Sequence, residues 1–222
     1  MAAYTLPSSW THNPDLEPFG YDPDTAANLL EAAGWRKINR NGARVCIGCG
    51  TADDNNRLVL RLLYNDSNNI DRQVALLIAR HLSRIGIEID VTGAGNAFIE
   101  ASGQRFDLYL DSSDTSFPVQ LDKSWFFSPE NDVVSSGSNV GSYINPDVTE
   151  LFNAIRTLDG CNMDERRERY YELERQVQAD LPYAWLFTPY EMTVFHNSIQ
   201  NVETFAHDPF ANIHEWSVWK MP

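Results

Sequence analysis

Residues 58–91 read LVLRLLYNDSNNIDRQVALLIARHLSRIGIEIDV, and this stretch decides the fold. Its first seven residues are almost continuously apolar, which is typical of a central strand buried on both faces. The polar run NDSNN closes that strand. Beyond Gly86, the apolar residues Ile87, Ile89 and Val91 alternate with polar ones, which predicts a second strand.

The segment between these two strands predicts a helix from about Ile70 to Ile85. A short helix at 96–102 and a strand at 106–110 follow, so strands and helices alternate along the chain. This order is typical of parallel strand pairs joined by crossover helices, and it predicts an α/β fold with a mixed β-sheet flanked by helices. The expected apolar stripe of the long helix consists of Ile70, Val74, Leu77, Ile78, Leu82 and Ile85.

Residues 21–35, YDPDTAANLLEAAGW, predict a short helix with both ends marked. Asp22 suits the N-cap, Pro23 the first helical position and Gly34 the left-handed residue after the last turn. Farther on, the sequence predicts helices from Asn145 and at 164–180, and strands at 184–188 and 192–196. The apolar stripes expected on these three helices are Ala26, Leu29, Leu30 and Ala33; Leu151, Phe152 and Ile155; and Tyr170, Leu173, Val177 and Leu181.

Composition narrows the class of protein. The chain of 222 residues is 43% hydrophobic, which is enough for a packed core. Its 31 acidic and 17 basic residues give a formal charge of −14, which argues against nucleic acid as a partner because phosphate binding needs a basic surface. No apolar run approaches the roughly 20 residues that span a bilayer. The first ten residues lack the basic and apolar parts of a signal peptide.

Several modest motifs occur in a recognisable order. They are YDPDTAANLLEAAGW at 21–35, the helix–glycine–strand segment at 71–91, NPDVTELFNAIRTLD at 145–159, DERRERYYELERQVQADLPYAWLFTP at 164–189 and HDPFANIHEW at 207–216. Together, from about Pro14 to Trp216, they resemble the family 5 extracellular solute-binding proteins, the peptide- and nickel-type receptors of ABC importers. The resemblance implies a periplasmic-binding-protein-like lobe, the second of two in a longer exported protein.

The resemblance also implies how such a protein works. The intact receptor would trap a small, peptide-like solute between two lobes and deliver it to an ABC permease in the membrane. Neither a cofactor nor a resident metal nor covalent chemistry is expected. The location would be extracellular or periplasmic, with a membrane anchor in an N-terminal region outside this chain. The expected organisation is an extended lead-in at 1–20, one ligand-binding lobe at 21–205 and a tail at 206–222 that returns toward the missing N-terminal lobe.

The ligand site is expected in the loop after the strand at 106–110. In peptide-binding members of the family, a Trp-x-x-Asp-x-x-acidic-Pro pattern there supplies an aspartate that grips the α-ammonium group of the ligand. Aligning Pro118 with that proline places Asp114 on the aspartate, while Asp111 replaces the tryptophan and Phe117 the acidic residue. A carboxylate here suits a cationic group. The candidate ligand contacts are Asp111, Ser113, Asp114, Thr115, Phe117 and Trp125.

The same carboxylates allow other interpretations. Asp111 and Asp114 at a strand end could serve a metal-dependent hydrolase, because strand-end carboxylates bind metal ions in many α/β enzymes. They could also form an ordinary solvated acidic turn. A third reading is an interaction domain without a small-molecule site. The sequence contains neither a G-x-S-x-G nor an H-E-x-x-H motif to support hydrolysis.

Cys46 and Cys49 form a C-x-x-C pair in a glycine-rich loop. A zinc site would need two more ligands, and Cys161 and the five histidines are not spaced as a partner pair. A local disulfide, free thiols and a redox or metal role all remain open. For an exported chain we expect the Cys46–Cys49 disulfide, with Cys161 free.

Overall fold

A computed structural model describes residues 2–36, 42–46, 57–112, 122–189, 192–205, 208 and 210–219. The chain forms two compact units, which are considered separately here. The sheet unit comprises Phe19–Ser112 and Trp125–Asn145. The helix unit comprises Met1–Pro18, Ser113–Ser124 and Pro146–Pro222.

The sheet unit is built on three parallel strands. β3 (Val59–Asn65) lies in the centre, between β4 (Glu88–Ala94) and β5 (Leu108–Tyr109). Leu62 is opposite Val91 on one side and Leu108 on the other. The predicted central strand and its parallel neighbours are therefore confirmed, although β5 is shorter than the predicted span of 106–110.

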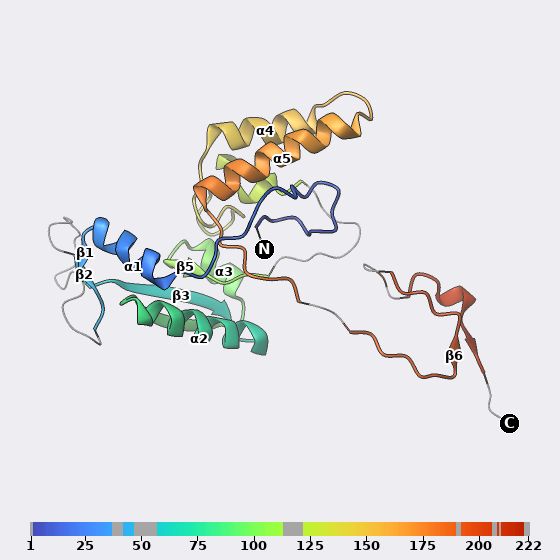
Figure 1. Ribbon diagram of the computed structural model, residues 1–222, viewed down its shortest axis with the longest axis horizontal. Coiled ribbons are helices and arrows are strands. Elements are labelled where there is room, and N and C mark those ends of the chain that lie inside the picture. Colours follow the sequence, from blue (N-terminus) through green and yellow to red (C-terminus); the bar gives the residue numbers. More distant parts are fainter. Residues whose placement is uncertain are drawn as a thin grey trace. The chain divides into compact units, whose positions relative to one another are not determined.

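Helices cover both faces of this sheet. Successive residues of a strand point to opposite faces, so neighbouring residues of β3 pack against different helices. Leu62 packs with Ala75 of α2 (Asn69–Arg84). The adjacent Leu63 packs with Ala97 and Ala101 of α3 (Ala97–Ser102). Right-handed crossovers that run in opposite directions along a sheet place their helices on opposite faces, which accounts for this arrangement. Figure 1 shows α2 running alongside β3.

The buried face of α2 differs from the predicted stripe. Asp71 and Ala75 are its buried residues, whereas Ile70 and Leu77 are 55% and 49% exposed. The face that meets the sheet runs through positions 71, 75 and 78, which lie one above another on a helix. Ile70 and Leu77 fall beside that line, so their assignment to the core was wrong.

The first helix has the predicted ends. α1 (Pro23–Ala32) begins after Asp22, whose carboxylate accepts a hydrogen bond of 2.9 Å from the Thr25 amide. The Thr25 hydroxyl also donates to this carboxylate, which lowers the pKa of Asp22. Gly34 has a φ of 95°, the left-handed conformation expected there. The apolar stripe was a wrong expectation, because α1 has no buried residue and Leu29 is 66% exposed.

A buried arginine ties the next segment to β1 and to the end of α2. β1 (Trp35–Arg36) pairs antiparallel with β2 (Val45–Cys46), and Arg44 precedes β2. The Arg44 guanidinium donates to the carbonyl of Trp35 in β1, at 2.9 Å, and to that of Ile85, the C-cap of α2, at 2.6 Å. Carbonyls at a helix C-terminus lack intrahelical donors, so a cation is favourable beside Ile85.

The helix unit contains a pair of packed helices. α4 (Pro146–Arg156) buries Val148, Phe152 and Ile155, and α5 (Met163–Asp180) buries Tyr170, Leu173, Glu174 and Val177. The predicted helices are confirmed. Arg169 and Arg166 of α5 donate to the carbonyls of Ala154 and Ile155, at 2.9 and 3.2 Å. Leu181 does not extend the stripe, because it is the left-handed C-cap of α5 and is 48% exposed.

The C-terminal part differs from the predicted strands. β6 (Ile199–Gln200) pairs antiparallel with β7 (Ser217–Val218), and the short helix η3 (Ile213–Glu215) lies between them. Residues 184–188 and 192–196 form no strand, so those two predictions were wrong. Their apolar residues favour strands, but a strand also needs a paired neighbour, and among the described residues β6 and β7 pair with each other and not with these segments. The division of the chain at residues 20 and 205 stays a prediction.

Candidate functional site

The carboxyl ends of β3, β4 and β5 meet at one edge of the sheet, because the strands are parallel. Asn65, the last residue of β3, is opposite Ala94, the last residue of β4, and Leu63 is opposite Tyr109 of β5. The chain leaves β3 toward α2 on one face and β4 toward α3 on the other. In open α/β sheets, ligands bind beyond the carboxyl ends of strands where neighbouring connections diverge in this way. We call residues 65–71, 94–96 and 109–112 the carboxyl edge.

Asp111 lies at this edge, two residues beyond β5. The Tyr109 hydroxyl donates to its Oδ1 atom at 3.1 Å. Desolvation raises the pKa of the Asp111 carboxyl, while the hydrogen bond from Tyr109 acts in the opposite direction. Burial raises the pKa of Tyr109 strongly, and the Asp111 charge adds to the effect. At neutral pH the phenol therefore keeps its proton and donates to the carboxylate.

A second carboxylate reaches the same edge from another element. Asp71 lies in the first turn of α2 and is buried. The Asn68 side chain donates to its Oδ1 atom at 3.0 Å, and the Oδ1 atom of Asn68 caps the helix by accepting from the Ile70 amide. The pKa of Asp71 is raised, first by desolvation and then by the negative charge of Asp111. The carboxyl edge therefore carries two acidic groups that act on each other, and a ligand cation would relieve that repulsion.

Sequence reasoning missed Asp71, because it fell inside the predicted amphipathic helix. One signal could have found it. Asn68 is a good N-cap, and an acidic residue in the first turn after a strand-to-helix loop lies near the carboxyl end of that strand. Asp71 was therefore a candidate on the same grounds as Asp111.

The structure says less about the other residues that were predicted to contact the ligand. Trp125 belongs to the short helix η1 (Ser124–Phe126), where its ring lies 5.8 Å from that of Phe126. Of the three adjacent aromatic residues only Phe127 is buried, and it packs edge-on against Tyr143. Ser113, Asp114, Thr115 and Phe117 lie outside the described residues.

The loop after Phe127 is held by buried polar groups. It includes the short helix η2 (Pro129–Asn131) and folds around Asn139, which is fully buried. The Asn139 side chain donates to the carbonyls of Ser128, at 3.2 Å, and Tyr143, at 2.8 Å, and accepts from the Tyr143 amide at 3.1 Å. This loop is therefore fixed at both ends next to the segment that carries Trp125.

The structure tests only part of the prediction for the cysteines. Cys46 is buried and takes part in a disulfide, whereas Cys161 is free and exposed. Cys49 lies outside the described residues, so the pairing of Cys46 with Cys49 stays a prediction. Over the described part of the chain, no three His, Cys, Asp or Glu side chains are grouped so that they could hold a metal ion. Within the same residues, no helix has the length and apolar character needed to cross a membrane.

Comparisons with known proteins agree with this architecture. The family described as bacterial extracellular solute-binding proteins, family 5 Middle, matches residues 1–133. The oligopeptide-binding protein AppA of Bacillus subtilis is 23% identical over 95% of this chain and 37% of its own length. The glutathione-binding protein GsiB of Pectobacterium atrosepticum is 25% identical over 87% of this chain and 34% of its own length. The chain therefore spans little more than a third of these relatives.

Solved structures share the fold. The structure of AppA from Bacillus subtilis in complex with a nonapeptide has a TM-score of 0.73 at 20% identity, and the match covers 99% of this chain and 42% of that one. NikZ from Campylobacter jejuni in complex with Ni(L-His) has a TM-score of 0.67 at 19% identity, with coverages of 97% and 43%. The fold class predicted from the sequence is thus confirmed. The family match over more than half of the chain shows that it belongs to the bacterial extracellular solute-binding proteins of family 5.

Proposed function

We propose that this chain is part of the substrate-binding component of an ABC importer and contributes one wall of the site that captures a small solute. The observation that carries the proposal is the carboxyl edge, where Asp111, Tyr109 and Asp71 gather beyond parallel strands. Family membership supports the same reading, as do relatives that are named for binding oligopeptides and glutathione. The full receptor would close over the solute and pass it to a membrane permease.

The solute class follows from the charge of the edge. Two carboxylates with raised pKa values favour a ligand that brings a positive charge, such as an ammonium group. Tyr109 orients Asp111 by donating to one of its oxygens. A peptide or another cationic solute fits this arrangement, with Asp114, Ser113, Thr115, Phe117 and Trp125 as further proposed contacts.

The remaining attributes are also proposals. The receptor would act outside the cytoplasm, as the family name states for its members, and would be anchored to the membrane through a part of the protein outside this chain. It would bind its solute without covalent chemistry. No observation favours the hydrolase that would use Asp111 and Asp114, and the relatives named above are binding proteins. That alternative is not taken further.

Native mass spectrometry of the full-length receptor, purified from its host, tests the proposal. We expect a retained solute that carries an amine or another cationic group. Asp111→Asn should weaken its binding by roughly 1.5–3 kcal/mol, the range for a hydrogen bond to a charged group, and Asp114→Asn should do the same. Asp90→Asn is the matched control, because Asp90 is exposed in the middle of β4, away from the carboxyl edge.

Two results would count against the proposal. One is a solute that stays equally well bound in the Asp111→Asn and Asp114→Asn variants. The other is an acidic or uncharged solute, which would show that the carboxylates do not select the ligand.

A further inference from the structure

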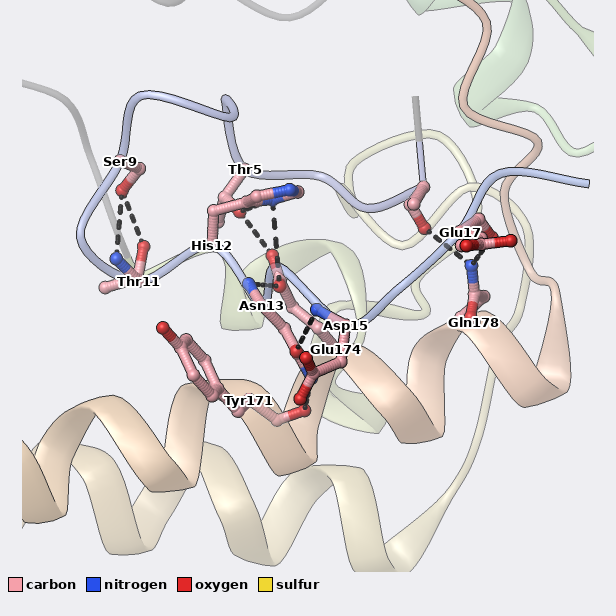
Figure 2. A network of polar contacts seen from close by, with 11 residues as sticks. Thr5, Ser9, Thr11, His12, Asn13, Asp15, Glu17, Tyr171, Glu174 and Gln178 are labelled. Atoms are coloured by element: carbon pink, nitrogen blue, oxygen red, sulfur yellow. Dashed lines mark hydrogen bonds and ion pairs between the residues drawn. The ribbon is translucent and has the colours of Figure 1, made fainter.

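The lead-in lies along one face of α5. Five of its residues are buried, although residues 2–18 contain neither a helix nor a strand: Ala2, Ala3, Thr5, Thr11 and Asn13. We call residues 2–18 the strap. The positions of α5 that hold it are 171, 174 and 178, which are three and four residues apart and so share one helix face (Figure 2).

Glu174 is the centre of this attachment. It is 1% exposed, and its two oxygens accept hydrogen bonds from two points of the strap. The Asn13 amide donates to Oε2 at 2.7 Å, and the Thr5 hydroxyl donates to Oε1. The Asn13 side chain adds a bond of 3.3 Å to the Tyr171 carbonyl. One buried carboxylate therefore fastens strap residues that lie eight positions apart.

His12 completes a titratable cluster. Its Nδ1 atom lies 3.1 Å from the Thr5 hydroxyl oxygen and 4.0 Å from Oε2 of Glu174. A hydroxyl can donate or accept, so Thr5 can bridge the two groups with the proton on either side. With the proton on His12, the bonds run from imidazole to hydroxyl to carboxylate. With the proton on Glu174, they run in the reverse direction, so the pair can hold one proton without losing a bond.

The other polar groups around the cluster carry no positive charge. Tyr4 is half-buried with its hydroxyl inside, and the Glu174 charge contributes, after desolvation, to its raised pKa. Gln178 is neutral and donates to the carbonyls of Ala2 and Glu17 at 3.2 and 2.9 Å. The amide of Asp15 donates to the Asn13 side chain. In the part of the chain that the structure describes, His12 is the cationic side chain paired with Glu174.

We propose that Glu174, Thr5 and His12 form a pH-sensitive latch, which fastens the strap to α5 more tightly as the pH falls. Desolvation raises the pKa of Glu174, although the bonds from Thr5 and Asn13 and the charge of His12 act against it. A carboxyl with a higher pKa in the attached state stabilises attachment below its free-state pKa. That contribution is lost as the pH rises through the attached-state pKa.

In this proposal, the latch sets how many residues before Phe19 are fastened to the helix unit. The strap ends at Pro18, and the chain passes into the sheet unit at Phe19. When the strap is fastened, residues 2–18 belong to the helix unit. When it is released, the same residues lengthen the free chain that leads to Phe19.

Trp10 reports on attachment directly. It belongs to the strap, and its ring packs edge-on against Tyr170 of α5 at 5.9 Å. We would label the 222-residue chain with 5-fluorotryptophan and assign Trp10 in ¹⁹F NMR spectra with the Trp10→Phe variant. Between pH 8 and pH 5, the Trp10 signal of the attached strap should grow at the expense of the released one. Glu174→Gln, which cannot titrate, should abolish this dependence.

Glu172→Gln is the matched control, because Glu172 lies on the same helix with a side chain that is 44% exposed. It should titrate like the unaltered chain. A flat titration in the unaltered chain, or an unchanged one in Glu174→Gln, would overturn the latch. Should Glu174→Gln fail to fold, Thr5→Val removes the bridge and keeps the Glu174 carboxyl. It should shift the midpoint by at least about half a pH unit, roughly a threefold change in proton affinity, and an unchanged midpoint would equally overturn the proposal.

Discussion

The sheet around β3 and the contact between the strap and α5 bury their centres with different chemistry. Around β3, adjacent leucines pack into apolar clusters on the two faces of the sheet. Along α5, the centre of the strap contact is Glu174, a carboxylate that is 1% exposed. Apolar burial needs only shape and volume, whereas a buried carboxylate needs specific donors in fixed places. The first kind of centre tolerates imprecise geometry, and the second depends on each partner.

This contrast predicts different responses to substitution. The largest effect should follow from emptying the apolar centre, since Leu63 is 2% exposed between β3 and α3. Leu63→Ala should lower the free energy of unfolding by about 3 kcal/mol, within the range of roughly 2–5 for buried leucines. Urea unfolding followed by circular dichroism measures this. Val59→Ala, in the same strand but 42% exposed, should cost much less, and equal losses would mean that the cluster is not a core.

Removing the polar centre should have the next largest effect. Glu174→Ala leaves the Asn13 amide buried without its acceptor, and an unsatisfied buried group costs about 1–3 kcal/mol. The matched variant Glu172→Ala removes an exposed carboxylate that pairs with Arg175, and it should change stability by less than about 1 kcal/mol. Thermal melting of both variants makes the comparison. A Glu174→Ala chain as stable as Glu172→Ala would show that the strap does not depend on the carboxylate.

Helix caps should behave alike in the two units, because their role is local. Asn96 caps α3 in the sheet unit, and Asn162 caps α5 in the helix unit, each accepting from a backbone amide three residues on. Asn→Ala at either position should cost about 1 kcal/mol, the usual value for an N-cap. Chemical unfolding of the two variants tests this. If only one of the two variants lost stability, the two units would be unfolding independently.

The smallest effect is expected on the outer face of α5. Arg167 pairs with Asp164 at 2.7 Å, and the two side chains are 38% and 84% exposed. Arg167→Ala should change the free energy of unfolding by about 0.5 kcal/mol or less, because exposed ion pairs are screened by water. A thermal melt at low and at high salt checks this. A loss of more than 1 kcal/mol that persists at high salt would mean that Arg167 has a packing role.

The sequence was sufficient for features that depend on local pattern. The apolar run that became β3, the cap at Asp22 and the glycine after α1 are all encoded within a few residues. The parallel sheet also followed, because alternating strands and helices permit few connections. Local pattern thus accounts for the order of elements in the sheet unit, but not for the faces that α1 and α2 bury.

Features that depend on distant partners could not be derived. Glu174 lies among charged residues on a helix, so it reads as solvated, yet its donors Thr5 and Asn13 are 169 and 161 positions away. The apolar residues at 184–188 and 192–196 resemble those of strands, but a sequence pattern cannot supply a paired neighbour. The ligand site stays a prediction, with Asp111 at the end of β5 as one of its proposed contacts. Asp71 was overlooked although local signals were present, because it was read as part of an amphipathic helix.

Hydrogen–deuterium exchange on the full-length receptor tests the central claim, that the solute binds at the carboxyl edge. Two samples of the receptor would be compared. One keeps its co-purified solute, and the other has lost the solute by dialysis in mild denaturant and has then been refolded. We predict that bound solute protects the amides of residues 66–71 and 109–112, at the ends of β3 and β5, and leaves α4 and α5 unchanged. Protection confined to the helix unit, or no change at the carboxyl edge, would contradict the account.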